Sequence, residues 1–484
     1  MNVNFRLVVS LLGYLIASSG GAMIVPAIID YITNQKGFET FFFLSLIVTF
    51  IGFSLAFANK NEYKVPLSLK EGFLLTVLSW IVLAAVCALP FKFSYLNLSY
   101  TDAYFEVMSG LTTTGATTLE DLSQLSYGLN FWRIFMGWIG GIGIIVTGMV
   151  LIPSMQPGMQ IFKVESFDSF DSAFDKAKRM AIGIIVVYIL ISLLTLFTLL
   201  FISNFNFFDA LVHAFSAVST TGFSNKNSSL LEFNSISAEI IISLAMFSGG
   251  LPYILLYYLI FLRKGTIFKD HQVRGYIKLV LIIIILLIAW LYLNNGIDFS
   301  QASRYGIFTA ISLITGTGLT TADYSLWGGF SSVLLVIAMT IGSCSGSKSA
   351  GLKIYRIQVA YAICAFMLRK IFLQKTPNVI LYNKRVVSYD IAVSIFTYCS
   401  LYFICLAFSS VILTALNLDL STAISASIAT LSNTGPGIGP LVGPSGNYFM
   451  IPDLGKWTLI SLMLLGRLEI LVVLVIFTRR FWKN

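Results

Sequence analysis

The sequence predicts an all-α polytopic membrane protein in which four tandem repeats surround one pore, preceded by two extra N-terminal transmembrane helices. Two observations lead to this fold class. Of the 484 residues, 57% are hydrophobic and only 11% are charged, whereas a soluble domain has about 25% charged residues. A Thr-Gly dipeptide also recurs four times in equivalent surroundings, ending at Gly115, Gly222, Gly318 and Gly435. Such repetition indicates one structural unit used four times.

The similarity between the repeats extends upstream of each Thr-Gly dipeptide. A small residue lies twelve positions before the glycine, a second lies six positions before it, and a hydroxyl side chain lies three positions before it. In repeat order these residues are Ala103, Ala210, Gly306 and Ala423; Ser109, Ser216, Ser312 and Ala429; and Thr112, Ser219, Thr315 and Ser432.

Apolar stretches near the length needed to cross a bilayer, about 20 residues, alternate with short polar loops. We expect ten crossings, with 328–346 and 352–370 as halves of one broken span. The others are 7–29, 40–58, 73–91, 131–153, 181–203, 237–262, 277–293, 390–416 and 457–478. The first stretch has features of a signal peptide, but its apolar character continues to Ile29, which favours a retained helix.

We divide the chain into an N-terminal helix pair and four repeats of span, shorter segment, Thr-Gly turn and second span. The divisions are 1–68, 69–160, 161–270, 271–385 and 386–484. The shorter segments are 101–112, 208–219, 303–315 and 420–431. A helix of about 12 residues is about 18 Å long, so these segments cannot cross a bilayer.

A half-length helix must return through the membrane as extended chain, and such backbone persists only where protein buries it or where it lines water. The negative end of each half-helix then points at the membrane centre. Glycine permits the dihedral angles that turn neighbouring carbonyls in one direction, and rings of carbonyls replace the hydration shell of potassium. A single Thr-Gly is best explained as an ordinary loop, whereas four in register favour a pore lining.

Charge predicts the orientation. With the N- and C-termini in the cytoplasm, most of the 31 lysines and arginines fall on the cytoplasmic side, as basic residues do in membrane proteins. The net charge of +9 therefore reflects topology, and no nucleic-acid partner is expected. Carboxylates such as Asp102, Glu106 and Asp209 fall on the outer side. They either concentrate cations at the pore mouth or only solvate loops.

Five motifs resemble those of the Trk/Ktr family of bacterial potassium transporters, in particular its Trk-type membrane subunit. They are Leu111–Ala116, Trp138–Ile144 continuing to Pro153, Ser219–Phe223, Asn433–Gly437 and Leu465–Glu469. The resemblance implies channel-like potassium uptake across the bacterial inner (plasma) membrane, driven by the membrane potential. It also implies a homodimer regulated by a cytosolic nucleotide-binding (TrkA-type) subunit. The segment Glu165–Arg179, with phenylalanines among charges, predicts an interfacial helix and is also a candidate contact for this subunit.

The resemblance assigns a potassium-binding filter to three residues at each turn. These are Thr113, Thr114 and Gly115; Thr220, Thr221 and Gly222; Gly316, Thr317 and Gly318; and Asn433, Thr434 and Gly435. Gly316 and Asn433 replace a threonine, so the expected filter is not fourfold symmetric. Glycine at all four turns resembles the potassium-selective form of the family. A sodium-coupled or sodium-permeable Ktr-type transporter is the alternative.

The segment 342–351 contains three glycines and four serines, a composition that cannot hold a stable helix in lipid. The resemblance implies a gate loop beneath the filter, formed by Gly342, Ser343, Gly346, Ser347, Lys348 and Gly351 and accompanied by Arg467. Ser345 and Lys348 also fit the S-x-x-K pattern of acyl-enzymes. Companion motifs are missing, so a membrane-embedded enzyme is a remote alternative and no cofactor is expected; potassium is the substrate.

We expect different roles for three charged residues near this loop, Lys348, Arg467 and Glu469. Lys348 either repels potassium in the closed state or lies at the cytoplasmic edge without a partner, and the second reading is favoured. Arg467 and Glu469 are two residues apart on one expected helix, so they point in different directions. The resemblance places Arg467 below the filter, although an ion pair with another helix is an alternative, and Glu469 is expected to face a neighbouring helix or the other protomer.

Overall fold

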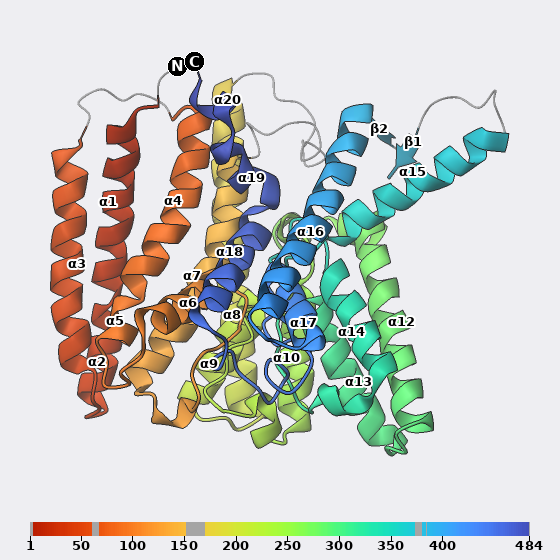
Figure 1. Cartoon of the computed structure of the whole chain (residues 1–484), viewed down its shortest axis with the longest axis horizontal. Helices are drawn as coiled ribbons and strands as arrows, with labels where there is room; N and C mark the ends of the chain where they lie inside the picture. Colours follow the sequence, from red (N-terminus) through yellow and green to blue (C-terminus); the bar gives the residue numbers. More distant parts are fainter. Residues whose placement is uncertain (1–2, 61–66, 152–169, 373–379, 384, 484) are drawn as a thin grey trace.

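The computed structural model describes residues 3–60, 67–151, 170–372, 380–383 and 385–483. Long helices stand side by side across the molecule, and both termini lie at the same end (Figure 1). The boundary expected at residue 160 and the first part of the expected contact segment, 165–169, lie outside the described residues. The remainder of that segment forms the start of a long helix.

Two N-terminal elements precede the repeats, as the sequence predicts. The first consists of α1 (Phe5–Ala22) and α2 (Ile24–Ile32), and the second is α3 (Phe38–Ala58). A Cβ atom at Gly13 would lie 2.5 Å from the backbone nitrogen of Ala56 on α3. Glycine therefore lets the two backbones approach closely, as small residues do between membrane helices.

Each repeat contains a long first helix, a half-length helix and a second helix after the turn. Repeat 1 contains α4 (Leu69–Cys87), α5 (Leu89–Lys92), α6 (Tyr100–Leu111) and α7 (Tyr127–Leu151). Repeat 2 contains α8 (Phe170–Ile202), α9 (Phe207–Ser219), α10 (Ile236–Gly249) and α11 (Tyr253–Ile260). Repeat 3 contains α12 (His271–Leu293), α13 (Phe299–Ile314), α14 (Gly329–Ile341) and α15 (Ile354–Phe372). Repeat 4 contains α16 (Tyr389–Ala415), α17 (Leu420–Leu431), α18 (Asp453–Leu468), α19 (Ile470–Leu474) and α20 (Arg479–Trp482).

The half-length helices α6, α9, α13 and α17 match the predicted short segments closely. A polar side chain caps each N-terminus by accepting a hydrogen bond from a backbone N–H. The caps are Ser99, Asn206, Asp298 and Asp419. The sequence favours other capping residues, namely Thr101-Asp102, Asp209, Ser421 and either Ser300 or Ser303, so each cap lies a few residues earlier than expected.

The second span is interrupted in three repeats, whereas the sequence predicts a break only in repeat 3. Helices α10 and α11 meet at 105°, and α18 meets the segment that begins with α19 at 109°. In repeat 2, Pro252 lacks the N–H that a continuous helix requires. In repeat 4, Glu469 adopts a φ of +65°. The expectation of one unbroken helix through Arg467 and Glu469 is therefore wrong.

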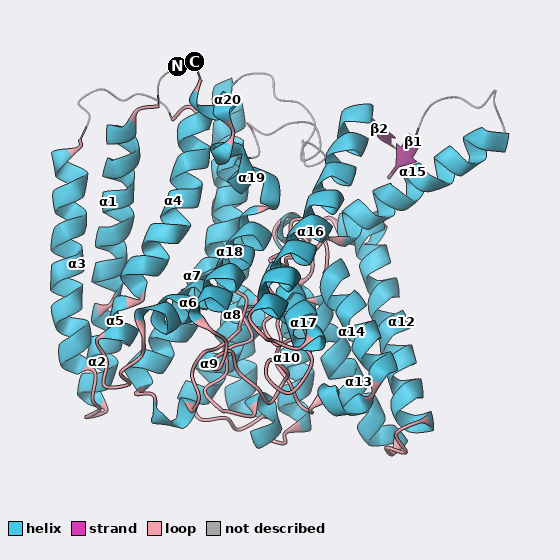
Figure 2. Cartoon of the chain, in the orientation of Figure 1, coloured by secondary structure: helices cyan, strands magenta, loops and turns pink. Residues whose placement is uncertain are grey.

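Six of the described helices are long and apolar enough to span a membrane, or eight elements if each bent pair counts as one span. The ten-span count remains a prediction. The chain is mostly helical, and the strands among the described residues form one antiparallel hairpin of β1 (Ile380–Tyr382) and β2 (Arg385–Val387) (Figure 2). The sequence did not predict this hairpin, which lies near α15 at one edge of the molecule.

Candidate functional site: a ring of four turns and the loop beneath it

The four half-length helices end in the same backbone conformation. Each is followed by a residue in the left-handed region, and the next residue donates its N–H to a carbonyl five positions earlier, a pattern of helix C-terminal capping. The left-handed residues are Thr113 (φ 52°), Thr220 (56°), Gly316 (70°) and Asn433 (48°). The N–H groups of Thr114, Thr221, Thr317 and Thr434 bond the carbonyls of Ser109, Ser216, Ser312 and Ala429 at 2.8–3.0 Å.

This conformation explains why Gly316 and Asn433 replace threonine. Glycine and asparagine are the residues that adopt left-handed dihedrals most readily, whereas a β-branched residue is strained there. The replacements therefore preserve the backbone, and Thr113 and Thr220 hold the same shape against their own preference. The expected departure from fourfold symmetry concerns side chains rather than the path of the chain.

The four Thr-Gly turns form a closed ring. A Cβ atom at Gly115 would overlap the carbonyl oxygen of Thr221 in the next repeat. Equivalent overlaps join Gly222 to Thr317, Gly318 to Thr434, and Gly435 back to Thr114. All four glycines have positive φ, between 81° and 92°. Each glycine is therefore required twice, for its dihedral angles and for the approach of a neighbouring carbonyl.

Hydroxyl groups brace three of the four turns. Oγ1 of Thr114 bonds Oγ1 of Thr112 at 2.8 Å, and the equivalent pairs are Ser219 with Thr221 at 2.6 Å and Thr315 with Thr317 at 2.7 Å. The side chain of Thr221 also packs against Gly137 on α7. The recurring hydroxyl three positions before each glycine thus supports the turn in repeats 1 to 3.

The fourth turn is built differently. The hydroxyl of Ser432 bonds the Tyr402 hydroxyl at 2.6 Å instead of Thr434. Asn433 Nδ2 donates to Thr114 Oγ1 at 2.8 Å and to the carbonyl of Met463 at 3.0 Å. Within the described part of the chain, Thr434 Oγ1 and Asn433 Oδ1 have no hydrogen-bond partner. The asymmetry expected from the sequence therefore includes the hydrogen bonds behind the turn.

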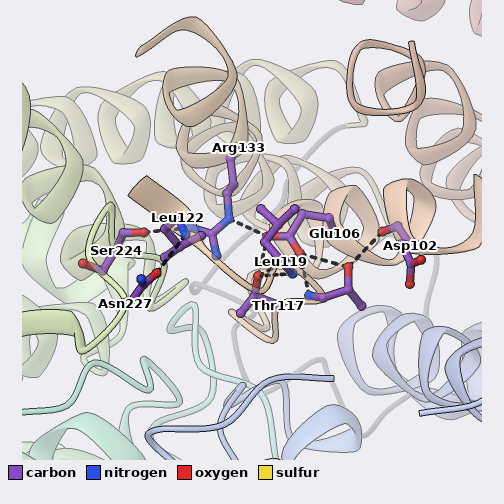
Figure 3. Close-up of polar contacts among 9 residues, drawn as sticks. Asp102, Glu106, Thr117, Leu119, Leu122, Arg133, Ser224 and Asn227 are labelled. Atoms are coloured by element: carbon purple, nitrogen blue, oxygen red, sulfur yellow. Dashed lines mark hydrogen bonds and ion pairs between the residues drawn. The ribbon is translucent and has the colours of Figure 1, made fainter. Parts of the chain in front are cut away.

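A pocket opens beside the ring and is lined by three of its glycines and by Pro436, which follows the fourth. Charged side chains in the lining are Arg133 and Lys226. Arg133 forms an ion pair with Glu106 and donates to the carbonyl of Ser224 at 2.8 Å (Figure 3). Its guanidinium also lies 3.7 Å from the ring centroid of Phe223. It thereby joins the segments that follow the turns of repeats 1 and 2.

Glu106 is the centre of this network (Figure 3). It accepts hydrogen bonds from the Thr117 hydroxyl and from the Thr118 N–H, at 3.0 and 2.9 Å. Asp102, one helical turn earlier, bonds Lys456 Nζ of repeat 4 at 2.5 Å. Glu106 and Asp102 are 1% and 6% exposed. Asp102 therefore joins repeat 1 to repeat 4 and Glu106 braces repeat 1 itself, so neither of these buried carboxylates merely solvates a loop.

The segment 342–351 passes along the other side of the ring. Gly342, Gly346 and Gly351 all have positive φ, between 68° and 80°. The loop is held by repeat 2, because the N–H of Cys344 donates to the carbonyl of Gly250 and the N–H of Tyr253 donates to the carbonyl of Gly346. A Cβ atom at Gly316 would lie 3.6 Å from Ser349 Oγ. The loop therefore reaches the Thr-Gly turn of its own repeat.

The favoured expectation for Lys348 is wrong. This residue is 1% exposed rather than at an edge. Its Nζ donates to the carbonyl of Val218 at 2.8 Å and lies 3.3 Å and 4.2 Å from the ring centroids of Tyr188 and Tyr253. Sequence reasoning did not identify either tyrosine, because they lie far from Lys348 along the chain.

Arg467 lies against the loop 342–351, next to which the resemblance places it. Its Nη1 donates to the carbonyl of Lys348 at 2.5 Å. Among the described residues Arg467 forms no ion pair, and the alternative of a pair with another helix stays a prediction. Glu469 faces a neighbouring segment of its own chain, with Arg356 at 2.8 Å and Lys353 at 3.5 Å.

Known proteins resemble this chain over nearly its full length. The family model for TrkH, described as a cation transport protein, matches residues 39–483. The Trk system potassium uptake protein TrkI of Halomonas elongata is 36% identical over 428 residues, covering 87% of this chain and 86% of TrkI. The Trk system potassium uptake protein TrkH of Escherichia coli K12 is 32% identical over 492 residues, covering 100% of both. The crystal structure of the potassium transporter TrkH from Vibrio parahaemolyticus matches with a TM-score of 0.90 at 27% identity, covering 99% of this chain and 100% of the other.

Proposed function

Because this chain belongs to the TrkH family of cation transport proteins, we propose that it takes up potassium across the bacterial plasma membrane through the ring of four Thr-Gly turns. Curated relatives from Halomonas elongata and Escherichia coli carry the description of Trk system potassium uptake proteins. They are transporters, which argues against the enzyme alternative raised by Ser345 and Lys348.

The closed ring of glycine and threonine contacts is the observation that carries this proposal. Four threonine carbonyls follow one another around the ring. Carbonyl oxygens arranged in this way take the place of the water molecules that a potassium ion loses when it enters a filter. The C-termini of four half-helices meet there and contribute partial negative charge. We assign the ion-binding sites to backbone carbonyls of Thr113, Thr114, Gly115, Thr220, Thr221, Gly222, Gly316, Thr317, Gly318, Asn433, Thr434 and Gly435.

The driving force is the membrane potential. One elementary charge crossing 100 mV changes free energy by about 2.3 kcal/mol, which corresponds to roughly 50-fold accumulation because 1.36 kcal/mol is tenfold. We propose that the loop 342–351 and Arg467 close the path below the filter, with a cytosolic nucleotide-binding TrkA-type subunit controlling the loop. We further propose that the protein forms a homodimer and that both termini of each protomer lie in the cytoplasm.

Ion competition in proteoliposomes tests the selectivity. We expect potassium flux well above sodium flux for the native protein, and a loss of selectivity in Gly115→Ser, because a side chain there overlaps the Thr221 carbonyl at a φ of +84°. Gly21→Ser is the matched control, since a Cβ atom at Gly21 meets nothing within 4 Å. Equal sodium and potassium flux in the native protein would favour the sodium-permeable alternative.

A further inference from the structure

The side chain of Lys348 lies among three residues of repeat 2, Val218, Tyr188 and Tyr253, which we call the socket. Its ammonium group lies against the carbonyl of Val218 and the ring faces of Tyr188 and Tyr253. Val218 belongs to the last turn of the half-length helix α9, where carbonyls lack partners inside the helix. The socket thus offers a helix end of negative polarity and two aromatic faces that attract a cation.

The backbone of the same residue is held from another repeat. Arg467, on α18 of repeat 4, donates to the carbonyl oxygen of Lys348. The contacts of the filter ring run from repeat 1 to 2, 3, 4 and back to 1. Repeats 2 and 4 are therefore on opposite sides of the ring. Lys348 belongs to repeat 3, which lies between them in the ring, and it binds both of these neighbouring repeats at once.

No carboxylate neutralises this arrangement within the described part of the chain, where the ion pairs do not include Lys348 or Arg467. Two guanidinium nitrogens of Arg467, Nε and Nη2, also have no partner there. The Lys348 side chain is consequently held by a carbonyl dipole and two aromatic rings. When it leaves them, no buried carboxylate is left without its partner, unlike when a buried ion pair is broken. Such a contact is suited to release.

We propose that Lys348 is a tethered cation that latches the loop across the pore, and that opening requires its ammonium group to leave the socket of Val218, Tyr188 and Tyr253. While latched, the residue joins repeats 2 and 4 beneath the filter and places positive charge on the path of a permeating cation. This inference rests on the proposed potassium uptake function and adds the residue that holds the closed state.

The test measures potassium flux through the full-length protein in proteoliposomes without the regulatory subunit. Lys348→Met keeps an unbranched side chain but removes the charge and the donor, and we expect the basal flux to rise about tenfold, equivalent to about 1.4 kcal/mol. Tyr253→Leu should also raise it, by severalfold, because it removes one ring of the socket.

Tyr253→Phe is the matched control. The Tyr253 hydroxyl has no hydrogen-bond partner among the described residues, so phenylalanine keeps the ring face and should leave the basal flux unchanged. Equal flux in the leucine and phenylalanine variants, or unchanged flux in Lys348→Met, would overturn the latch. If Lys348→Met does not fold, the two Tyr253 variants decide the matter.

Failure of the underlying function gives a different result. In that case the native protein with its regulatory subunit carries no potassium above the leak of empty liposomes. If only the latch is wrong, the native protein with its regulatory subunit carries potassium normally, and without that subunit the Lys348 and Tyr253 variants have the same basal flux as the native protein.

Discussion

Asn433 donates a hydrogen bond from Nδ2 to Oγ1 of Thr114, at 2.8 Å, and so joins the turn of repeat 4 to the turn of repeat 1. These two repeats lie at opposite ends of the repeat array in sequence, and the ring closes between them. The same amide group donates to the carbonyl of Met463 on α18. Asn433 therefore supports both the left-handed turn and the seam that completes the ring.

Asn433→Thr should destabilise the protein more than Asn433→Gly. Both variants lose the two amide hydrogen bonds, but threonine must also hold a β-branched side chain at a φ of 48°, at a cost of about 1 kcal/mol. The unfolding midpoint of purified protein in detergent measures the difference. Equal midpoints would show that the backbone conformation at this position carries no strain.

Glu469→Gln should loosen the C-terminal end of the loop 342–351. Glu469 pairs with Arg356 and with Lys353, and Lys353 itself holds a φ of +66° two residues after the loop. Losing these charge-assisted contacts should cost about 2 kcal/mol, seen as a lower unfolding midpoint, and should raise flux without the regulatory subunit.

Glu239→Gln is the control for that variant. It disrupts a similar pair, with Arg304 at 2.6 Å, but at the contact of α10 and α13, away from the loop. It should lower the unfolding midpoint and leave basal flux unchanged. A rise in basal flux in both variants would mean that general destabilisation, rather than the loop exit, opens the path.

Glu106→Gln should be among the most damaging substitutions outside the ring. It leaves the Arg133 guanidinium, 3% exposed, without its ion-pair partner, and breaking a buried pair on one side costs about 3–5 kcal/mol. The double variant Glu106→Gln with Arg133→Met should recover part of the loss. Unfolding midpoints of the two single variants and the double variant form a mutant cycle, and strict additivity would contradict the coupling.

Asp419 should make the free energy of unfolding decrease at acidic pH, because it caps the fourth half-length helix only while its carboxylate is ionised. Hydrogen bonds from Ser421 and Thr422 lower the pKa of this exposed carboxylate to about 2. Since the folded pKa lies below the unfolded value of about 3.9, the stabilisation is complete above pH 4 and is lost as the pH falls towards 2. Asp419→Asn, also a good cap, should remove this contribution to the acid dependence. Unfolding midpoints recorded from pH 5 to 2 compare the two proteins.

Local sequence is enough to predict the half-length helices and the glycine turns. Their length and the need for positive φ are properties of short segments, and the helices and turns lie close to the expected positions, although each capping residue lies a few residues earlier than expected. The break after Gly249 also has a local signal, Gly249-Gly250-Leu251-Pro252, although the apolar residues around it predict one continuous span over 237–262. The break at Glu469 had no comparable signal, since glutamate does not favour a φ of +65°.

The order of the repeats around the ring, the burial of Lys348 and the partners of Asp102, Glu106 and Glu469 were decided by tertiary structure alone. These contacts join residues that are tens to hundreds of positions apart, as between Lys348 and Val218 or between Lys456 and Asp102. Periodicity and motifs describe a side chain's own segment. Whether a charge is solvated, paired or held by a carbonyl depends on which other segments the fold brings to it.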